Sequence, residues 1–221
     1  MTTEKTEIKS SAITLDEIEQ FIFGAGSDNL GTFGGIFGGG IQIQQISDEL
    51  APCIFAILES GEPVKAYLEI GAAAGGSAFI VNHFIKPERI VLVDDNQHPK
   101  AHIRPYILRN ILHDEIIGNS HEVSTVAKVY NMGIFFDALM IDGDHMYEGV
   151  KADVIKYGEF LRPGGFLIFH DSQIGAPYGC AKVFQELRKD KRWEFIAEYI
   201  SKKHKPCGTG FFRKAGTRED K

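Results

Sequence analysis

The sequence predicts an α/β protein with a Rossmann-like, mostly parallel seven-stranded sheet, an antiparallel last strand and helices on both faces. Three observations support this. From residue 66 onward, short apolar runs alternate with longer segments of helical period. The last two apolar runs are joined by a link too short for a crossover helix. The 221 residues are enough to bury the core of one large domain.

The first five strands are expected to be parallel, because a helical segment separates each from the next. The strands are predicted at 66–71, 89–94, 115–118, 135–141 and 165–170. The helices between them are predicted near 77–85, 99–112, 122–131 and 147–160. The last of these helices ends before the turn sequence Arg-Pro-Gly-Gly at 162–165.

The C-terminal part is predicted to close the sheet with an antiparallel pair. A helix near 178–190 precedes two strands at 193–200 and 207–214, and the polar link SKKHKP joins them. Such a link allows a hairpin but no parallel crossover. This ending distinguishes the sheet from an all-parallel dinucleotide-binding one.

The N-terminal part has a different composition, which suggests a separate segment. A helix is predicted at 14–23, followed by a stretch in which glycine recurs too often for a helix or strand interior. A flexible linker and a lid over the site are both open, and Phe33, Ile36 and Phe37 favour the lid. We therefore expect a helical and Gly-rich cap or lid at 1–60, the main domain at 61–214 and a disordered tail at 215–221. The apolar side chains of the first segment also suggest a homo-oligomer formed through it.

Composition and charge narrow the choice of partner. The formal net charge of −6 and the absence of a basic stripe argue against nucleic acid. Cys53, Cys180 and Cys207 are far apart and lack metal-ligand spacing, as expected of reduced thiols. The first residues are polar, and no apolar run approaches a membrane span. We expect a cytoplasmic protein that acts on a small molecule.

A turn of small residues follows the first predicted strand and precedes a helix. Gly71, Ala73, Gly75 and Gly76 leave room for a ligand against the main chain, and the helix start offers free N–H groups. Ser77 stands where an ATP-binding loop needs lysine.

The same turn also differs from the dinucleotide fingerprint, because Ala73 stands at its middle glycine. NAD is thereby disfavoured without being excluded. Glu69, just before the turn, suits a cofactor with a cationic amino-acid end. S-adenosylmethionine has such an end.

Two further strand ends suit a nucleoside cofactor. Asp94 ends the second strand about 20 residues beyond the turn, where a carboxylate can accept hydrogen bonds from ribose hydroxyls. Asn119 and Ser120 follow the third strand and can meet the adenine edge. A cap of the next helix is an equally good interpretation of these two residues.

Polar side chains end the fourth and fifth predicted strands. These are Asp142, Asp144 and His145 after one strand, and His170 and Asp171 after the other. Neighbouring strand ends lie about 5 Å apart, so Asp142, His170 and Asp171 can converge on a divalent cation. Helix caps and a core-edge histidine are the structural alternatives, but so many polar groups together favour a functional site.

With these motifs, the chain resembles the class I S-adenosylmethionine-dependent methyltransferases. Within them it is similar to metal-dependent small-molecule O-methyltransferases, in the branch of macrolide sugar O-methyltransferases and cephalosporin hydroxylase-like proteins. The similarity covers about residues 40–214. It depends on IQQ at 43–45, YLEIGAAAGGS at 67–77, FDALMIDGDHMYEGVKAD at 136–153 and LRPGGFLIFHDS at 161–172.

The resemblance implies a role for each matching residue. The methionine end of the cofactor would contact Glu69, Gly71 and Ser77. The ribose would contact Asp94, and the adenine would contact Ser120. The cofactor site would be completed by Ala73, Gly75, Gly76 and Asn119. Asp142 would contact both cofactor and metal and take part in catalysis, with His170 and Asp171 as further metal ligands. His145 would be the general base.

One departure from the family concerns the metal. His170 stands where the family has an oxygen ligand, and imidazole suits Mn, Fe, Co or Zn better than Mg. Magnesium fits if only Asp142 and Asp171 bind it, together with water.

The expected reaction is metal-assisted O-methylation of a hydroxyl on a sugar, polyketide or phenolic compound. Two alternatives stay open. One is a non-haem iron oxygenase that uses His145, His170 and an aspartate. The other is a protein that binds the cofactor without catalysis.

Overall fold

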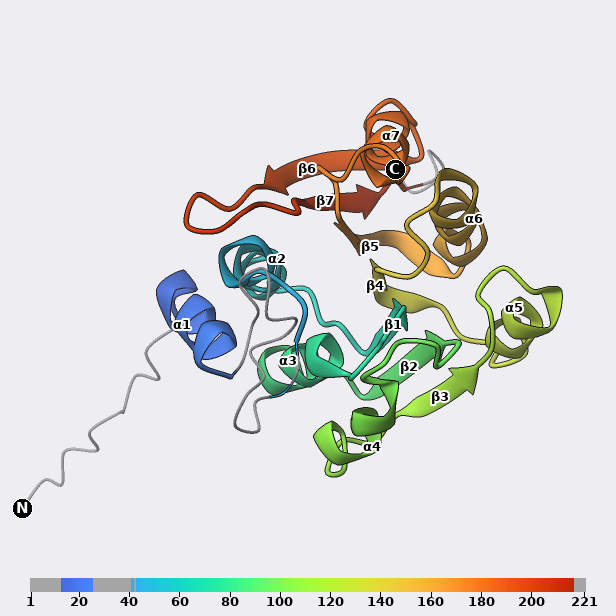
Figure 1. The fold of residues 1–221 in the computed structure, drawn as a ribbon, viewed down its shortest axis with the longest axis horizontal. Coiled ribbons are helices and arrows are strands. Elements are labelled where there is room, and N and C mark those ends of the chain that lie inside the picture. The colour runs from blue at the N-terminus through green and yellow to red at the C-terminus, as the bar shows by residue number, and fades with distance from the viewer. Residues whose placement is uncertain (1–12, 26–40, 42, 217–221) are drawn as a thin grey trace, which may run out of the picture.

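The computed structural model describes residues 13–25, 41 and 43–216. Its centre is a seven-stranded sheet with the order β3-β2-β1-β4-β5-β7-β6 (Figure 1). The strands β1 to β5 are parallel, and β7 is antiparallel to both of its neighbours, β5 and β6. This architecture confirms the predicted fold class, including the antiparallel last strand.

The observed strands agree closely with the predicted ones. They are β1 (Ala66–Ile70), β2 (Arg89–Asp94), β3 (Asp114–Ile117), β4 (Phe136–Ile141), β5 (Leu161–His170), β6 (Trp193–Tyr199) and β7 (Thr209–Lys214). β5 begins four residues before its predicted start at 165, because Leu161 already pairs with Phe136. The pairing shifts register between Phe136 and Ala138, so the Pro-Gly-Gly turn is accommodated as an irregularity within the strand.

Helices cover both faces of the sheet. One face carries α1 (Leu15–Ala25), α2 (Ser47–Glu59) and α3 (Gly76–Phe84), and the other carries α5 (Val123–Tyr130), α6 (Tyr147–Gly158) and α7 (Cys180–Leu187), as Figure 1 shows. Successive strand residues point to opposite faces. Met140 therefore belongs to the core beside α2, while Leu139 and Ile141 belong to the core beside α6.

The helix predicted at 99–112 is wrong in extent. The structure has only a 3₁₀ turn, η1 (Ala101–Ile103), followed by the short α4 (Arg104–Ile107). Proline has no N–H, so Pro105 cannot donate to the carbonyl of Ala101, which favours the observed break between the two segments.

The structure also contains a helix that the sequence analysis missed. α2 carries Leu50, Ile54 and Ile57 on one fully buried face. Pro52 lies inside this helix, a position in which proline is usually disfavoured.

Other expectations concern segments that the structure leaves undescribed. Most of the Gly-rich stretch, at 26–40, and the tail from 217 on lie outside the described residues, so the lid and the disordered tail stay predictions. Among the described helices, none is long and apolar enough to cross a membrane.

Candidate active site

A cavity of about 630 Å³ opens at the carboxyl ends of the parallel strands. Residues that follow β1, β2, β3, β4 and β5 line it, as expected for a ligand crevice in an open α/β sheet. The cavity brings together nine of the predicted site residues: Gly71, Ala73, Asp94, Asn119, Ser120, Asp142, His145, His170 and Asp171. Glu69, Gly75, Gly76 and Ser77 are not among its lining residues.

The turn after β1 touches the end of β4. Gly71 has a φ of +88°, and a Cβ at this position would lie 2.0 Å from the carbonyl oxygen of Asp142. The N–H of Asp142 in turn donates to the carbonyl of Ile70, at 2.9 Å. Glycine is therefore required here for the close approach of two backbones as well as for the turn.

Glu69 is fully buried beneath this turn. Its carboxylate accepts hydrogen bonds from the hydroxyl of Tyr67, at 2.8 Å, and from the hydroxyl of Ser77. Burial raises the pKa of Glu69 to about 7, although both hydrogen bonds lower it. Glu69 and Ser77 thus connect strand β1 to the start of α3, and their predicted contact with the cofactor stays a prediction.

Part of the small-residue turn makes room for the chain itself. A Cβ on Gly76 would lie 2.6 Å from the Cα of Ile43, which belongs to the N-terminal segment. Gly75 has a φ of +84° and precedes α3. The segment around residue 43 therefore lies directly across the start of α3.

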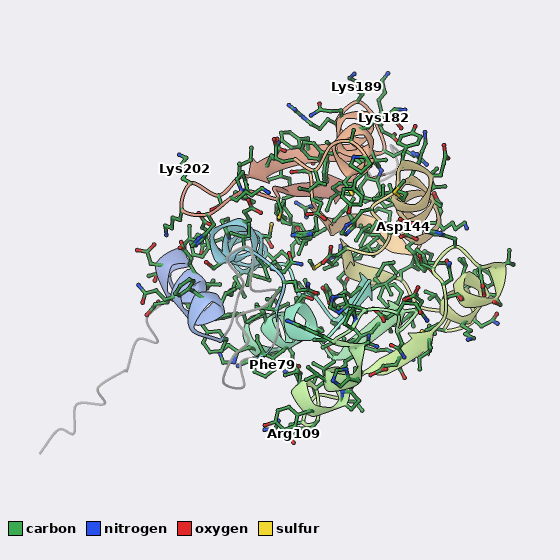
Figure 2. All side chains as sticks on the ribbon, viewed as in Figure 1. Phe79, Arg109, Asp144, Lys182, Lys189 and Lys202 are labelled. Atoms are coloured by element: carbon green, nitrogen blue, oxygen red, sulfur yellow. The ribbon has the colours of Figure 1, made fainter. Side chains whose placement is uncertain are left out.

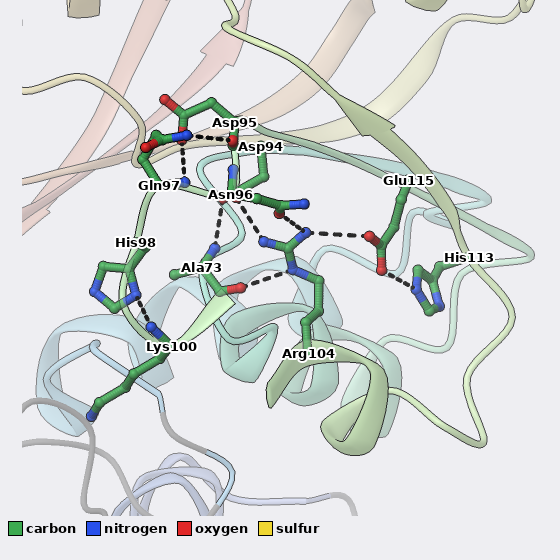
Figure 3. Close-up of polar contacts among 10 residues, drawn as sticks. All are labelled: Ala73, Asp94, Asp95, Asn96, Gln97, His98, Lys100, Arg104, His113 and Glu115. Carbon is green, nitrogen blue, oxygen red and sulfur yellow. Dashed lines mark hydrogen bonds and ion pairs between the residues drawn. The ribbon is translucent and has the colours of Figure 1, made fainter. Parts of the chain in front are cut away.

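The carboxylate of Asp94 is held by the turn at 71–75 between β1 and α3, which we call the cofactor turn, and by its own loop (Figure 3). Its Oδ2 accepts the N–H of Ala73 and its Oδ1 accepts the N–H of Asn96, each at 2.8 Å. The guanidinium of Arg104 forms an ion pair with the same carboxylate, at 2.7 Å. Arg104 was not predicted as a site residue; it lies within the helix predicted at 99–112.

Asn119 and Ser120 line the cavity after β3 without capping α5. The side chain of Asn119 accepts the N–H of His121 at 2.8 Å, while Glu122 occupies the N-cap and makes no side-chain cap hydrogen bond. The interpretation of these two residues as a helix cap is therefore wrong. Their predicted contact with adenine stays a prediction.

The predicted metal ligands lie together at the floor of the cavity. Asp142, His170 and Asp171 each offer a ligand atom, and these three atoms lie within 4.8 Å of one another. The Nδ1 of His170 is 2.9 Å from Asp142 Oδ1 and 3.3 Å from Asp171 Oδ1. Asp171 adopts a φ of +61°, a left-handed conformation that is uncommon for a residue with a side chain.

His145 lies beside the same carboxylates. Its Nε2 is 3.2 Å from Asp171 Oδ2 and 3.7 Å from Asp142 Oδ1. The facing Asp142 carboxylate is the main cause that raises the pKa of His145. Burial disfavours the charged form of His170, but the carboxylates of Asp142 and Asp171 outweigh it and hold the His170 pKa well above its usual range.

Asp144 belongs to the turn before α6 rather than to the metal cluster. Its Oδ1 accepts the N–H of Met146, at 2.7 Å, but Met146 is the N-cap of α6 and no side chain caps this helix, so the interpretation of Asp144 as a helix cap is wrong. Figure 2 shows Asp144 at this end of α6, while Lys182, Lys189 and Lys202 lie at the periphery of the molecule.

Gln45 is a site residue that sequence reasoning did not assign. It is 2% exposed, and its Nε2 donates to Asp142 Oδ2 at 2.7 Å. Its Oε1 is buried without a hydrogen-bond partner. The IQQ motif at 43–45, one of the sequences on which the family resemblance depends, was the available signal, but nothing in the spacing connects it with residue 142.

The ligand set of a non-haem iron oxygenase is not assembled among the described residues. The group that can hold an ion there contains two aspartates and one histidine, whereas the facial triad requires two histidines and one carboxylate. His145 is outside this group.

Part of the chain that lines this cavity is similar to known proteins. Residues 68–172 match a protein family described as "Methyltransferase domain". A curated relative, the uncharacterized protein R132 of Acanthamoeba polyphaga mimivirus, is 26% identical over 115 residues, which are 48% of this chain and 51% of the relative. The match thus spans about half of the relative's length.

Solved structures share the fold at low sequence identity. An O-methyltransferase from Bacillus cereus in complex with SAH is 16% identical, with a TM-score of 0.62 over 94% of this chain and 93% of that one. The MycE methyltransferase from the mycinamycin biosynthetic pathway, in complex with Mg, SAH and mycinamycin VI, is 15% identical, with a TM-score of 0.59 over 95% of this chain and 55% of that one. Residues 68–172 therefore match a methyltransferase family, and the chain has the same fold as these solved methyltransferase structures.

Proposed function

We propose that this protein transfers a methyl group from S-adenosylmethionine to a hydroxyl of a small molecule, with the help of a divalent cation. The observation that carries the proposal is the convergence of Asp142, His170 and Asp171 in the cavity that the cofactor turn also lines. His145 faces the same carboxylates. Sugar, polyketide and phenolic hydroxyls are the acceptor classes we propose.

The donor set fits a divalent cation. The carboxylates of Asp142 and Asp171 lie close together in a largely buried part of the cavity. The charged form of His170, which contacts both, compensates their repulsion when no cation is bound. Two carboxylates and an imidazole suit Mn, Fe, Co or Zn, and the carboxylates together with water suit Mg. Such a cation, when bound, lowers the pKa of an acceptor hydroxyl that binds it.

His145 is the proposed general base. Its Nε2 faces the two aspartates, so both carboxylates stabilise the imidazolium that forms when the ring takes a proton from the acceptor. Methyl transfer by direct displacement then requires little more than alignment of acceptor and methyl group in a site that excludes water. The Gly-rich stretch at 24–40 is the proposed lid that excludes it.

Similarity to other proteins supports the proposed acceptor class. The Bacillus cereus structure is an O-methyltransferase, and the MycE structure contains magnesium and a mycinamycin. Both are distant in sequence, so the case for this chain depends on its own aspartates and histidines.

Calorimetry and turnover together test the proposal. We expect the wild-type protein to bind S-adenosylhomocysteine and to methylate members of a panel of sugar, polyketide and phenolic alcohols. Methylation should stop after chelation and return with Mg²⁺, Mn²⁺ or Co²⁺. Asp171→Asn should reduce the metal-dependent rate, whereas cofactor affinity should change little.

Other results would favour a different function. Cofactor binding without methylation of any acceptor would indicate a non-catalytic cofactor-binding protein. Oxygen uptake after anaerobic Fe(II) titration would indicate the iron oxygenase. Failure to bind S-adenosylhomocysteine, with or without metal, would overturn the central claim.

We also propose an organisation for the whole chain. Residues 1–60 form a cap or lid, residues 61–214 the main domain and residues 215–221 a disordered tail, in a cytoplasmic protein that forms homo-oligomers through the N-terminal segment. Sedimentation of the full chain tests the oligomer. A monomer at micromolar concentration would contradict it.

A further inference from the structure

A single buried arginine connects four separate groups next to the cofactor turn. Arg104 is 1% exposed and belongs to α4, which does not itself line the cavity. Its Nη2 lies 2.7 Å from Asp94 Oδ1, and its Nη1 lies 3.0 Å from Asn96 Oδ1 and 3.3 Å from Glu115 Oε2 (Figure 3). Asp94 and Glu115 together compensate the charge that Arg104 brings into the interior.

The fourth contact of Arg104 reaches the cofactor turn itself. Its Nε donates to the carbonyl of Ala73 at 2.8 Å, while the N–H of Ala73 donates to Asp94 at 2.8 Å. Ala73 is therefore held at both of its backbone polar groups by one ion pair. The two hydrogen bonds fix the two peptide groups that flank the Cα of Ala73, and so restrict the φ and ψ of this residue more strictly than either bond alone.

Ala73 needs such support because of its backbone conformation. Its φ is +43°, in the left-handed region that a side chain disfavours. Ala73 also lines the cavity, so its conformation shapes the surface that the cofactor meets. Without Arg104, the turn can relax toward the ordinary backbone region and change that surface.

We infer that Arg104 is a positioning residue for the cofactor: through Asp94 and the Ala73 peptide, it holds the cofactor turn in its binding conformation. This inference rests on cofactor binding in this cavity. It assigns Arg104 no contact with the cofactor or with the acceptor. Its substitution should therefore weaken cofactor binding by loosening the turn.

A double-mutant cycle on the folded protein separates this role from general stability. Calorimetry would measure the Kd for S-adenosylhomocysteine of the wild type, Arg104→Lys, Ala73→Gly and the double variant. We expect Arg104→Lys to raise the Kd at least tenfold. Glycine adopts a positive φ without strain. The fold-increase in Kd caused by Arg104→Lys should therefore be severalfold smaller in the Ala73→Gly background than in the wild-type background.

A matched control and a milder variant complete the experiment. Arg89 pairs with Asp114 at 2.9 Å at the opposite end of β2, so Arg89→Lys should leave the Kd within twofold of the wild type. If Arg104→Lys does not fold, Glu115→Gln replaces it in the same cycle. Glu115→Gln removes only the negative charge of one partner of Arg104 and should raise the Kd about threefold.

Three outcomes are distinguishable. Absence of binding by the wild type contradicts the proposed function. If folded Arg104→Lys has the same Kd as the wild type, the inference about Arg104 is overturned and the proposed function is unaffected. The same holds for folded Glu115→Gln where that variant is used. An equal fold-change in the wild-type and Ala73→Gly backgrounds also overturns the inference, because the effect would then not act through the Ala73 peptide.

Discussion

The buried carboxyl of Glu69 should make the stability of the protein depend on pH. Its pKa is about 7 in the folded protein, against an ordinary value of 4.5. Because the folded state binds this proton more tightly, the contribution of Glu69 to stability is fully present below about pH 4.5 and is lost as the pH rises to about 7. At about 1.4 kcal/mol for each pKa unit, the loss amounts to about 3 kcal/mol.

The Glu69→Gln variant isolates this contribution. Denaturant unfolding of both proteins from pH 5 to pH 8 gives the difference between their free energies of unfolding, and we expect this difference to shift in favour of the variant by about 2–3 kcal/mol as the pH rises. Tyr67→Phe removes a hydrogen bond that lowers the Glu69 pKa, so it should raise that pKa further and make the loss at high pH larger. A constant difference between wild type and Glu69→Gln across this range would refute the reasoning.

Three further variants test other parts of the site. His145→Ala should lower kcat by about 10²- to 10⁴-fold in a methyl-transfer assay while the Kd for S-adenosylhomocysteine stays within about twofold; equal activity would exclude a general base. Gly76→Ala should lower the free energy of unfolding by about 1–3 kcal/mol, because the added Cβ would collide with the backbone of Ile43. The control Gly24→Ala adds a Cβ with no atom within 4 Å and should not lower the free energy of unfolding. Gln45→Leu should weaken the metal dependence of turnover, since Asp142 loses a 2.7 Å hydrogen bond; an unchanged metal titration would contradict this.

The sheet was predictable because its strands are local patterns. Each parallel strand is a short apolar run with turn residues after it, and the polar residues that end two of them led directly to Asp142, His145, His170 and Asp171. Convergence followed from topology alone, since the carboxyl ends of parallel strands share one edge.

The parts that were missed depend on long-range contacts. Arg104 lies on a segment whose spacing gives no sign that its side chain folds back onto Asp94. Gln45 contacts Asp142 across almost a hundred residues of sequence. For α2, a local signal did exist in the spacing of Leu50, Ile54 and Ile57, but the prediction did not use it.

The two outer strands of the sheet limit how the protein can associate through its backbone. Outer strands expose unpaired N–H and C=O groups that can recruit a strand of another molecule and begin aggregation. Here β3 has only four residues and begins with Asp114 and Glu115, while β6 carries Glu194 and Glu198 and shifts register within its length. Short length, negative charge and irregularity all oppose strand addition. The sheet thus ends on both sides in strands that resist fibre formation.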